Sequence, residues 1–211
     1  MRLGLLGIGH QGQKYIKTLK GMGVELAWAS NSPRYDADSI IIATPAQTHY
    51  ELAKRALELG RNVLIEKPMV MDLDQAKELY DLALKKNVTG FVDHTHLYSP
   101  AWREMKKKGP FRCGFFTAGG QCETDPRWDW GSHGAAMCID LNVPVEMNIK
   151  PGRVMFFADR LVYDDPFTIP RPMEVLMSEF LSSEHDQSGI KMGVEVTKAL
   201  CESESITSAT T

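Results

Sequence analysis

The chain lacks most of the features that would place it outside a reducing compartment. It has only four cysteines in 211 residues, widely spaced and without a C-x-x-C pair, so neither a disulfide framework nor a zinc site is expected. It contains no apolar run of the roughly 20 residues that cross a membrane. Its first residues do not have the pattern of a signal peptide. We therefore predict a cytoplasmic protein with no membrane contact and no bound metal.

The chain also lacks a strong charge of either sign. Its 24 Lys and Arg residues against 27 Asp and Glu give a formal net charge of −3, whereas nucleic-acid binders usually carry a basic patch. The one dense basic run, residues 106–108, is typical of the solvated end of a helix. We therefore expect no nucleic-acid partner. A hydrophobic content of 43% is ordinary for a globular protein, and the length allows one large or two small domains.

A glycine-rich turn near the amino terminus is the most informative feature that is present. Residues 1–6 have the pattern of a buried strand and residues 14–20 that of a helix. Between them lies Gly7-Ile8-Gly9-His10-Gln11-Gly12, the G-x-G-x-x-G pattern in the strand-to-helix context that gives it meaning. Gly7 permits a tight turn, Gly9 lets the backbone approach a pyrophosphate, and Gly12 lets helix and strand pack closely. The turn therefore predicts a dinucleotide-binding site at a helix N-terminus.

Strands and helices alternate over the first 95 residues. Further strands are predicted at 24–29, 39–43, 62–66 and 88–92, and helices from about 48 and from 72. Asp72, with Gln75 three residues later, indicates a capped helix start, and Gly60 indicates a helix end. This alternation predicts right-handed crossovers and a doubly wound parallel sheet. Residues 31–38 are too few for a helix between the second and third strands.

From about residue 96 the pattern changes. Helices are predicted over 100–108, 131–141, 172–181 and 190–201, and strands over 112–118, 145–149, 154–158 and 160–163. We therefore predict two domains, a dinucleotide-binding Rossmann domain over 1–95 and a reduced α/β domain over 96–211. The second domain should contain an open, mostly antiparallel sheet of about four strands. We expect the helices that begin at Gly131 and Pro172 to cover one face of that sheet.

Four short motifs follow one another along the chain: the glycine turn, Ala43-Thr44-Pro45 with His49, Glu66-Lys67-Pro68, and Asp129-Trp130-Gly131-Ser132-His133. Together they resemble the glucose–fructose oxidoreductase/inositol dehydrogenase/MocA (Gfo/Idh/MocA) family of NAD(P)-dependent oxidoreductases. The resemblance implies a Rossmann domain followed by an α/β domain whose open sheet forms a floor for the substrate. It places the family's usual Lys on Lys67 and its Asp and His on Asp129 and His133. Where family members commonly carry a further Asp, this chain has Ala136.

Lys67, Asp129 and His133 are the predicted catalytic residues. Lys67 follows a strand at the carboxyl edge of the sheet, where ligands bind, and its ammonium could stabilise the alkoxide that develops as hydride leaves. A cis bond to Pro68 would fix the direction of this side chain. Asp129 and His133 share a face if a helix begins here, so Asp129 could be its N-cap and orient His133 as general acid/base. The alternatives are a surface lysine and a helix-surface histidine.

The choice of cofactor depends on the end of the second strand. An acid about 20 residues past the glycines would favour NAD, and an arginine would favour NADP. No acid occurs there before Asp36, and Asn31, Ser32 and Arg34 suit a 2′-phosphate. NADP is therefore favoured, with NAD possible. The predicted cofactor cleft also includes four residues at or just after strand ends: Thr44, Pro45, His49 and Glu66. For His49, a buried histidine with its hydrogen bonds satisfied inside the protein is an equal alternative.

Polar residues after the last Rossmann strand are predicted to contact the substrate. His94, His96 and Trp128 are assigned to this group with Lys67, Asp129 and His133. The two histidines of His-x-His would point to one face of an extended segment, but Asp93 would point to the other. Polar substrate contacts or packing are therefore favoured over a zinc site.

The leading interpretation is an oxidoreductase that transfers hydride between nicotinamide and a secondary alcohol or ketone of a sugar, sugar derivative or cyclitol. A non-catalytic dinucleotide-binding or interaction protein is the alternative from another class, favoured by Ala136 and the reduced sheet. Glycoside cleavage through transient oxidation, which some family members perform, is a third. In the strand at 154–158, Val154, Phe156 and Ala158 alternate with Met155 and Phe157. Since neither face is polar, we expect a homodimer or higher oligomer.

Overall fold

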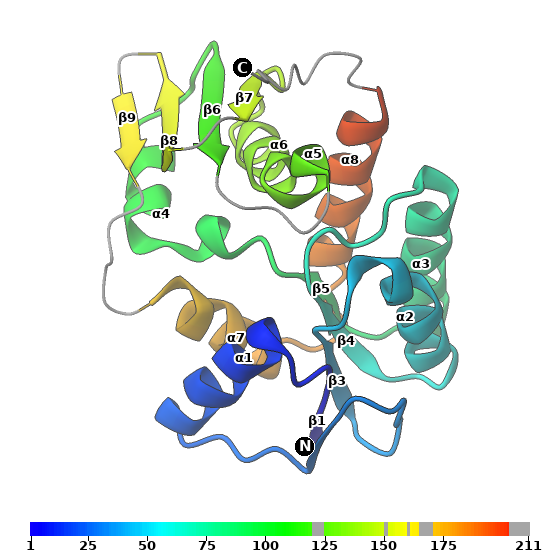
Figure 1. Ribbon diagram of the computed structural model, residues 1–211. Helices are drawn as coiled ribbons and strands as arrows, with labels where there is room; N and C mark the ends of the chain where they lie inside the picture. The colour runs from blue at the N-terminus through cyan, green and yellow to red at the C-terminus, as the bar shows by residue number, and fades with distance from the viewer. Residues whose placement is uncertain (120–124, 150–151, 160, 165–170, 203–211) are drawn as a thin grey trace. The chain divides into compact units, whose positions relative to one another are not determined.

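The computed structural model describes residues 1–119, 125–149, 152–159, 161–164 and 171–202. The chain forms two compact units (Figure 1). The first unit contains Met1–Asp93 together with Leu176–Val194, and the second contains His94–Val175 together with Glu195–Thr211. Among the described residues, no helix combines the length and the apolar character needed to span a membrane.

The first unit is built on a five-stranded parallel sheet. Its strands are β1 (Leu3–Leu6), β2 (Trp28–Ser30), β3 (Ser39–Ile42), β4 (Asn62–Ile65) and β5 (Gly90–Val92), in the order β2-β1-β3-β4-β5. Because the chain moves outward from β1 in opposite directions to β2 and to β3, the switch point of the sheet lies between β1 and β3. Ligands bind outside the carboxyl ends of the strands at such a point. The predicted doubly wound parallel sheet is confirmed.

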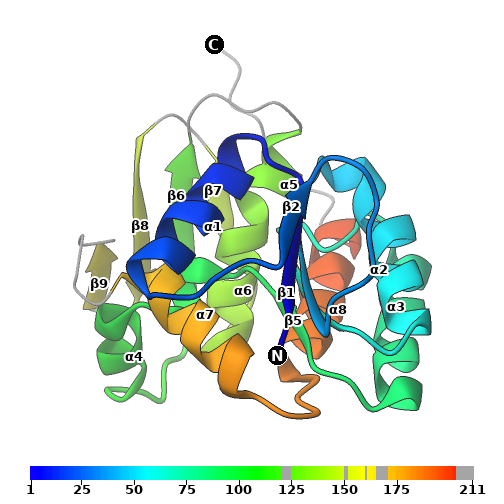
Figure 2. The same cartoon turned by 90° about the horizontal axis from the view of Figure 1, so that it is seen from below.

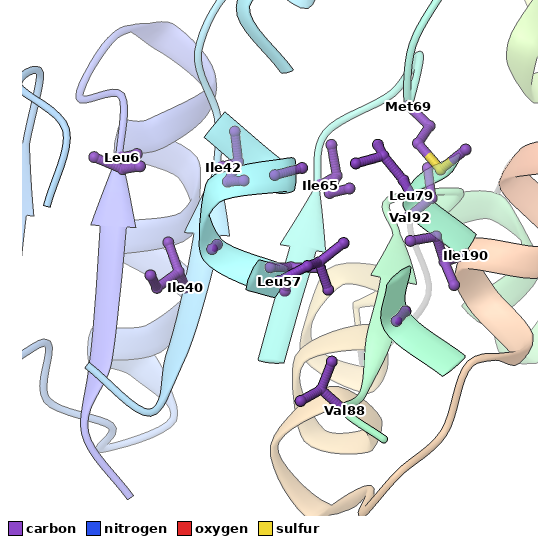
Figure 3. Packing of buried hydrophobic residues seen from close by; sticks show 14 of the residues in the cluster. Leu6, Ile40, Ile42, Leu57, Ile65, Met69, Leu79, Val88, Val92 and Ile190 are labelled. Carbon is purple, nitrogen blue, oxygen red and sulfur yellow. The ribbon is translucent and has the colours of Figure 1, made fainter. Parts of the chain in front are cut away.

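Helices cover both faces of this sheet. They are α1 (His10–Gly21), α2 (His49–Glu58), α3 (Leu73–Lys86) and the parts of α7 (Pro172–Ser182) and α8 (Ser188–Glu202) that belong to the first unit. Figures 1 and 2 show α2 and α3 on one face, with α1 and α7 on the other. Figure 3 shows how Leu6, Ile42 and Ile65 meet Leu57 and Leu79 under α2 and α3. β-branched runs thus fill a sheet that is buried on both faces.

The predicted helix ends of this unit have the expected geometry. Oδ1 of Asp72 accepts a hydrogen bond from the backbone N–H of Gln75 at 2.9 Å, so Asp72 is the N-cap of α3. Gly60 follows α2 with a φ of +69°, the left-handed conformation that glycine adopts without strain. Residues 31–38 form no helix and connect β2 to β3 directly.

The second strand is shorter than the sequence predicted. Residues 24–27 precede β2. The backbone N–H of Val24 donates to the carbonyl of Leu19 near the end of α1 at 2.9 Å, whereas that of Ala27 donates to Leu3 of β1 at 2.8 Å. The turn at Gly23, with a φ of +71°, allows this closure. The apolar character of Val24 and Leu26 indicated a strand, but at Val24 local hydrogen bonding to the helix end prevails.

The second unit has a four-stranded sheet. Its elements are the 3-10 helix η2 (Thr95–Tyr98), α4 (Pro100–Lys106), β6 (Gly114–Gly119), α5 (Pro126–Asp129), α6 (Gly131–Asp140), β7 (Met147–Ile149), β8 (Gly152–Ala158) and β9 (Leu161–Asp164). The strand order is β7-β6-β8-β9. β8 is antiparallel to both neighbours, whereas β6 and β7 are parallel. This confirms the open, mostly antiparallel sheet.

Helices α4 and α6 form the core of the second unit with this sheet. The Trp102 ring of α4 lies edge-on to Phe156 and Tyr163, with centroids 5.1 and 5.3 Å apart. Its Nε1 donates to Oδ2 of Asp140, on α6, at 2.9 Å. On the α6 side, Gly134 lies so close to Phe116 that an added Cβ would be 2.5 Å from the ring. Close packing therefore requires glycine at this position.

The expectation that the Pro172 helix covers the second sheet is wrong. Residues 176–182 of α7 belong to the first unit, where Phe180 packs on Phe91 of β5 with ring centroids 5.7 Å apart. α8 begins in the same unit, and a Cβ added at Gly90 would be 2.9 Å from Ile190. These apolar side chains complete the cover of β5. Among the described residues of the Rossmann segment, no crossover helix follows β5 to cover it.

Candidate dinucleotide-binding and catalytic site

The three glycines of the turn after β1 have different surroundings, as the fingerprint requires. Gly7 has a φ of +91°, and an added Cβ would lie 2.3 Å from the carbonyl oxygen of Ala43. A Cβ at Gly12 would lie 2.0 Å from the carbonyl oxygen of Gly7, so glycine is needed for helix and strand to approach. At Gly9, no described atom beyond its chain neighbours lies within 4 Å of an added Cβ. The backbone is thus open to a ligand at Gly9 alone of the three.

The turn is held in place by residues at the end of β2. Gly7 donates its backbone N–H to the carbonyl of Ser30 at 2.9 Å, and Ile8 donates to Oδ1 of Asn31 at 3.0 Å. Gly9 is the N-cap of α1 and has no side chain to cap the first-turn amides, while His10 and Gln11 begin the helix. These amides and the helix dipole suit a phosphate. Asn31 therefore stabilises the turn, and it also lies where contact with the 2′-group of the cofactor's ribose is predicted.

Arg34 already has a partner in this loop. Its Nε and Nη2 donate to the two carboxylate oxygens of Asp36 at 3.0 and 2.7 Å, and its guanidinium lies 5.2 Å from the ring centroid of Trp28. The side-chain hydrogen bond from Arg34 lowers the pKa of Asp36. Ser32 donates its backbone N–H to Oγ of Ser30 at 3.0 Å. A 2′-phosphate on Arg34 would therefore compete with Asp36.

His49 is buried and connects the ends of β3 and β4. Its Nδ1 lies 2.8 Å from the carbonyl oxygen of Pro68, and its Nε2 lies 2.8 Å from that of Thr44. Burial lowers the pKa of His49, while the two carbonyl acceptors oppose this effect. With only 1% of its surface exposed, His49 connects Thr44 to Pro68. Pro45 lies at the exposed start of the turn before α2.

Glu66 lies in a buried polar cluster that the sequence did not indicate. Its Oε1 accepts from Nε2 of Gln11 at 2.7 Å, and its Oε2 accepts from the backbone N–H of Lys67 at 3.0 Å. The Tyr15 hydroxyl lies 3.2 Å from Oε1 of Glu66 and 2.5 Å from Oδ2 of Asp93. Burial, followed by the charge of Asp93, raises the pKa of Glu66 to about 8. In the sequence, the only indication of this cluster was that Gln11 and Tyr15 are polar residues at helical spacing in α1.

Lys67 lies where the strand-end prediction put it. It follows Glu66 after the end of β4, it is half-buried, and its bond to Pro68 is cis. This position is at the carboxyl end of the parallel sheet, on the same edge as the glycine turn.

His133 lies near the start of α6 in the second unit. Its ring meets that of His96 edge-on, with centroids 4.7 Å apart, and the Trp130 ring is 6.4 Å away. The ring of His96 also lies 6.5 Å from that of Tyr163, which the sequence did not single out. His94, just before η2, is buried. The second unit therefore brings His96 and His133 together.

Asp129 does not cap the helix of His133. It is the last residue of the short helix α5, which is capped by Asp125 through a 2.8 Å hydrogen bond from Arg127. The expected N-cap role of Asp129 is therefore wrong, because the helical segment starts earlier. Trp128 is buried beside it. Among the described residues, no three His, Cys, Asp or Glu side chains are grouped to hold a metal.

The fold and the glycine turn define a dinucleotide-binding protein of the Rossmann class. Residues 24–94 match the family described as "Oxidoreductase family, NAD-binding Rossmann fold", which is the Gfo/Idh/MocA family. Over these residues the chain matches the Rossmann domain of the Gfo/Idh/MocA oxidoreductases, the family that its motifs indicated.

Two curated relatives illustrate this similarity. An uncharacterized oxidoreductase of Escherichia coli is 52% identical over 54 residues, which are 26% of this chain and 16% of that protein. The UDP-N-acetylglucosamine 3-dehydrogenase of Acidithiobacillus ferrooxidans is 31% identical over 130 residues, covering 52% of this chain and 42% of that protein. The matches thus span less than half the length of either relative.

Similar solved structures extend the likeness in fold to both units. The WlbA dehydrogenase of Thermus thermophilus, solved with NAD and UDP-GlcNAcA, has a TM-score of 0.75. The likeness covers 95% of this chain and 93% of that chain at 14% sequence identity. At this identity the comparison establishes the fold alone.

Proposed function

We propose that this protein is an NAD(P)-dependent oxidoreductase that transfers hydride between nicotinamide and a secondary alcohol or ketone of a sugar-like substrate. The observation that carries the proposal is the glycine turn, in which space is left at Gly9 while Gly7 and Gly12 are closed by backbone atoms. This arrangement fits a dinucleotide whose pyrophosphate lies on the first-turn amides of α1. The similarity to a UDP-N-acetylglucosamine 3-dehydrogenase supports a sugar-like substrate.

The proton chemistry is assigned to three side chains. When bound, the nicotinamide supplies the hydride acceptor or donor. Lys67 stabilises the substrate oxygen as its charge develops, and His133 takes or returns the hydroxyl proton. Asp129 orients the imidazole. His94, His96 and Trp128 contact the substrate, and the assignment of the cofactor to the first unit and of the substrate to the second belongs to the same proposal.

NADP is the preferred cofactor in this proposal. Arg34 and Ser32 stand at the end of β2, and the Arg34 guanidinium is already oriented by Asp36 and Trp28. A 2′-phosphate would replace Asp36 on Nε and Nη2 of Arg34 and form charge-assisted hydrogen bonds of the kind that Arg makes bidentately. NAD binding would leave the Arg34–Asp36 pair intact.

Gly9→Ala provides the direct test of cofactor binding. An added methyl meets no described atom within 4 Å, so the fold should be unchanged, whereas the space of the pyrophosphate would be occupied. Gly21→Ala, at the other end of α1 and equally open, is the matched control. Calorimetric titration with NADP⁺ should show binding for the wild type and Gly21→Ala and a loss of at least about tenfold for Gly9→Ala. Equal affinity in all three would refute the proposal.

A non-catalytic dinucleotide-binding protein is the second candidate. Its specific support is Ala136, which is buried in α6 where the family commonly has an acidic residue. A panel of sugars, sugar nucleotides and cyclitols, followed by NAD(P)H absorbance, separates the two candidates. Cofactor binding without turnover on any of them would favour the second.

A further inference from the structure

Gln11 has two contacts of different kinds at the start of α1. Its backbone N–H is one of the first-turn amides that follow the N-cap Gly9, and such amides have no acceptor within their own helix. Its side chain turns the other way, and Nε2 donates to Oε1 of Glu66 at 2.7 Å. Gln11 therefore belongs to the proposed pyrophosphate site through its backbone and contacts the residue after β4 through its side chain.

Glu66 connects the Gln11 side chain to Lys67. The Glu66 side chain is buried, and its second oxygen, Oε2, accepts a hydrogen bond from the backbone N–H of Lys67 at 3.0 Å. One carboxyl group thus joins the amide of Gln11 to the main chain of the proposed catalytic lysine. In a buried site such hydrogen bonds hold their partners in one arrangement, because a broken bond leaves a polar group without water.

The position of the Tyr15 hydroxyl gives the bond from Gln11 its weight. Tyr15 lies one turn further along α1, and its hydroxyl oxygen is 3.2 Å from Oε1 of Glu66 but 2.5 Å from Oδ2 of Asp93. A phenol has one proton to donate, and the shorter distance directs that proton to Asp93. Of these two side chains of α1, Gln11 therefore makes the stronger hydrogen bond to Oε1 of Glu66.

Three elements hold the backbone on either side of Lys67, all of them in the first unit. The N–H of Glu66 donates to the carbonyl of Ile42 in β3 at 2.9 Å. Nδ1 of His49 in α2 lies 2.8 Å from the carbonyl oxygen of Pro68. The third contact runs through the Glu66 side chain and comes from α1, whose first turn is the proposed phosphate site. A ligand on that turn is therefore connected to Lys67 by two consecutive hydrogen bonds.

We propose that Gln11 is a positioning residue for Lys67, acting through Glu66, and that it couples occupancy of the phosphate turn to the placement of that lysine. This inference rests on the proposed function. A pyrophosphate on the first-turn amides binds the ordered start of α1 best and so favours one position of the Gln11 side chain. The hydrogen bond to Glu66 then fixes the backbone N–H of Lys67. Gln11 itself acts on neither the hydride nor the proton.

Amide hydrogen exchange at Lys67, followed by NMR without cofactor, tests the positioning role. Gln11→Met keeps the length of the side chain and removes the donor, so the Lys67 N–H should exchange at least about fivefold faster than in the wild type. The Glu66 N–H, which bonds to Ile42 in the sheet, should keep its rate. Gln47→Met, the same substitution at an exposed residue of the turn before α2, should change neither rate.

Two results of this comparison would overturn the positioning role. The first is an equal exchange rate of the Lys67 N–H in the wild type, Gln11→Met and Gln47→Met. The second is an equal acceleration of the Lys67 and Glu66 amides in Gln11→Met, which would show a general loss of stability.

Addition of NADPH tests the coupling. In the wild type, saturating NADPH should slow exchange of the Lys67 N–H at least about fivefold, the lower end of typical coupling between sites. In Gln11→Met, bound NADPH should leave this rate within about twofold. Calorimetry shows whether NADPH is bound in each sample. The wild-type measurement decides the coupling by itself if Gln11→Met does not fold.

The outcomes with NADPH separate the coupling from the proposed function. Bound NADPH without slower exchange at Lys67 in the wild type would overturn the coupling and leave the proposed function intact. Absence of binding by NADPH and NADH would refute the proposed function and the coupling together. The comparison without cofactor would still decide whether Gln11 holds Lys67.

Turnover distinguishes positioning of Lys67 from a separate role of Gln11. Gln11→Met should lower kcat by about 10- to 100-fold, because a catalytic group misplaced by about 1 Å costs up to about 10²-fold. In the Lys67→Ala background the same substitution should lower kcat by less than about twofold, since the group that Gln11 positions is absent. A decrease of equal size in both backgrounds would contradict the proposal, because Gln11 would then act independently of Lys67.

Discussion

Glu66→Gln should change how the stability of the protein depends on pH. In the folded chain the pKa of Glu66 is raised from 4.5 to about 8, first by burial and then by Asp93. The unfolded chain gives up this proton above pH 4.5, whereas the folded chain keeps it until about pH 8. The stability contributed by protonated Glu66 is therefore fully present below pH 4.5 and is lost as pH rises to 8. Gln at this position is neutral at every pH.

The size of the effect follows from the shift. At about 1.4 kcal/mol per pKa unit, the whole change is about 5 kcal/mol, of which about 3 to 4 kcal/mol falls between pH 5 and pH 8. The substitution also has a cost. The backbone N–H of Lys67 now donates to Oε2 of Glu66, and in the variant it would face the amide N–H group of Gln, which cannot accept a hydrogen bond. Such a lost hydrogen bond costs about 1–3 kcal/mol at any pH. The variant should thus be less stable than the wild type at pH 5 and more stable at pH 8.

Urea titration followed by tryptophan fluorescence and circular dichroism at both pH values measures this reversal. The difference between variant and wild type should change by about 3 kcal/mol between the two pH values. Glu51→Gln, which removes an exposed carboxyl of α2, should follow the wild type throughout. If Glu66→Gln ran parallel to the wild type at both pH values, Glu66 would be ionised in the folded protein and the burial argument would be wrong.

Three further predictions concern the cofactor loop, the proposed catalytic residues and the oligomeric state. Arg34→Ala should lower the affinity for NADP⁺ by about tenfold and leave that for NAD⁺ nearly unchanged, since only the 2′-phosphate uses the guanidinium; equal losses in titration calorimetry would contradict this. Lys67→Ala and His133→Ala should each lower turnover by about 10²–10⁴ with cofactor affinity retained; near-normal steady-state rates would remove them from the mechanism. Light scattering at micromolar concentration should give at least a dimer mass. Phe115 on β6 is 38% exposed, whereas Phe116 faces the core, and an exposed apolar side chain on the sheet favours contact with a second copy. A monomer mass would contradict this oligomer. The side chains of Val154, Met155 and Phe157 lie outside the described residues.

The sequence was sufficient where the physical constraint is local. The positive φ at Gly7, the cap at Asp72 and the left-handed Gly60 are each imposed by a few neighbouring residues. Strand and helix periodicity also depends only on nearby side chains, so the parallel sheet and its order of elements could be predicted. The limit of this reasoning appears at Val24, whose backbone N–H bonds to Leu19 of α1 in place of a neighbouring strand.

Only the tertiary structure decided which distant groups meet. Tyr15 and Asp93 are 78 residues apart in the chain, and no spacing rule connects them to Glu66. The return of residues 176–194 to the first unit depends on close packing at Gly90 and Phe91, which required the folded sheet. The same holds for His49, whose two carbonyl partners come from different strand ends. Burial and pairing across the chain set these pKa values, and neither can be read from local sequence, because both arise only when separate elements pack together.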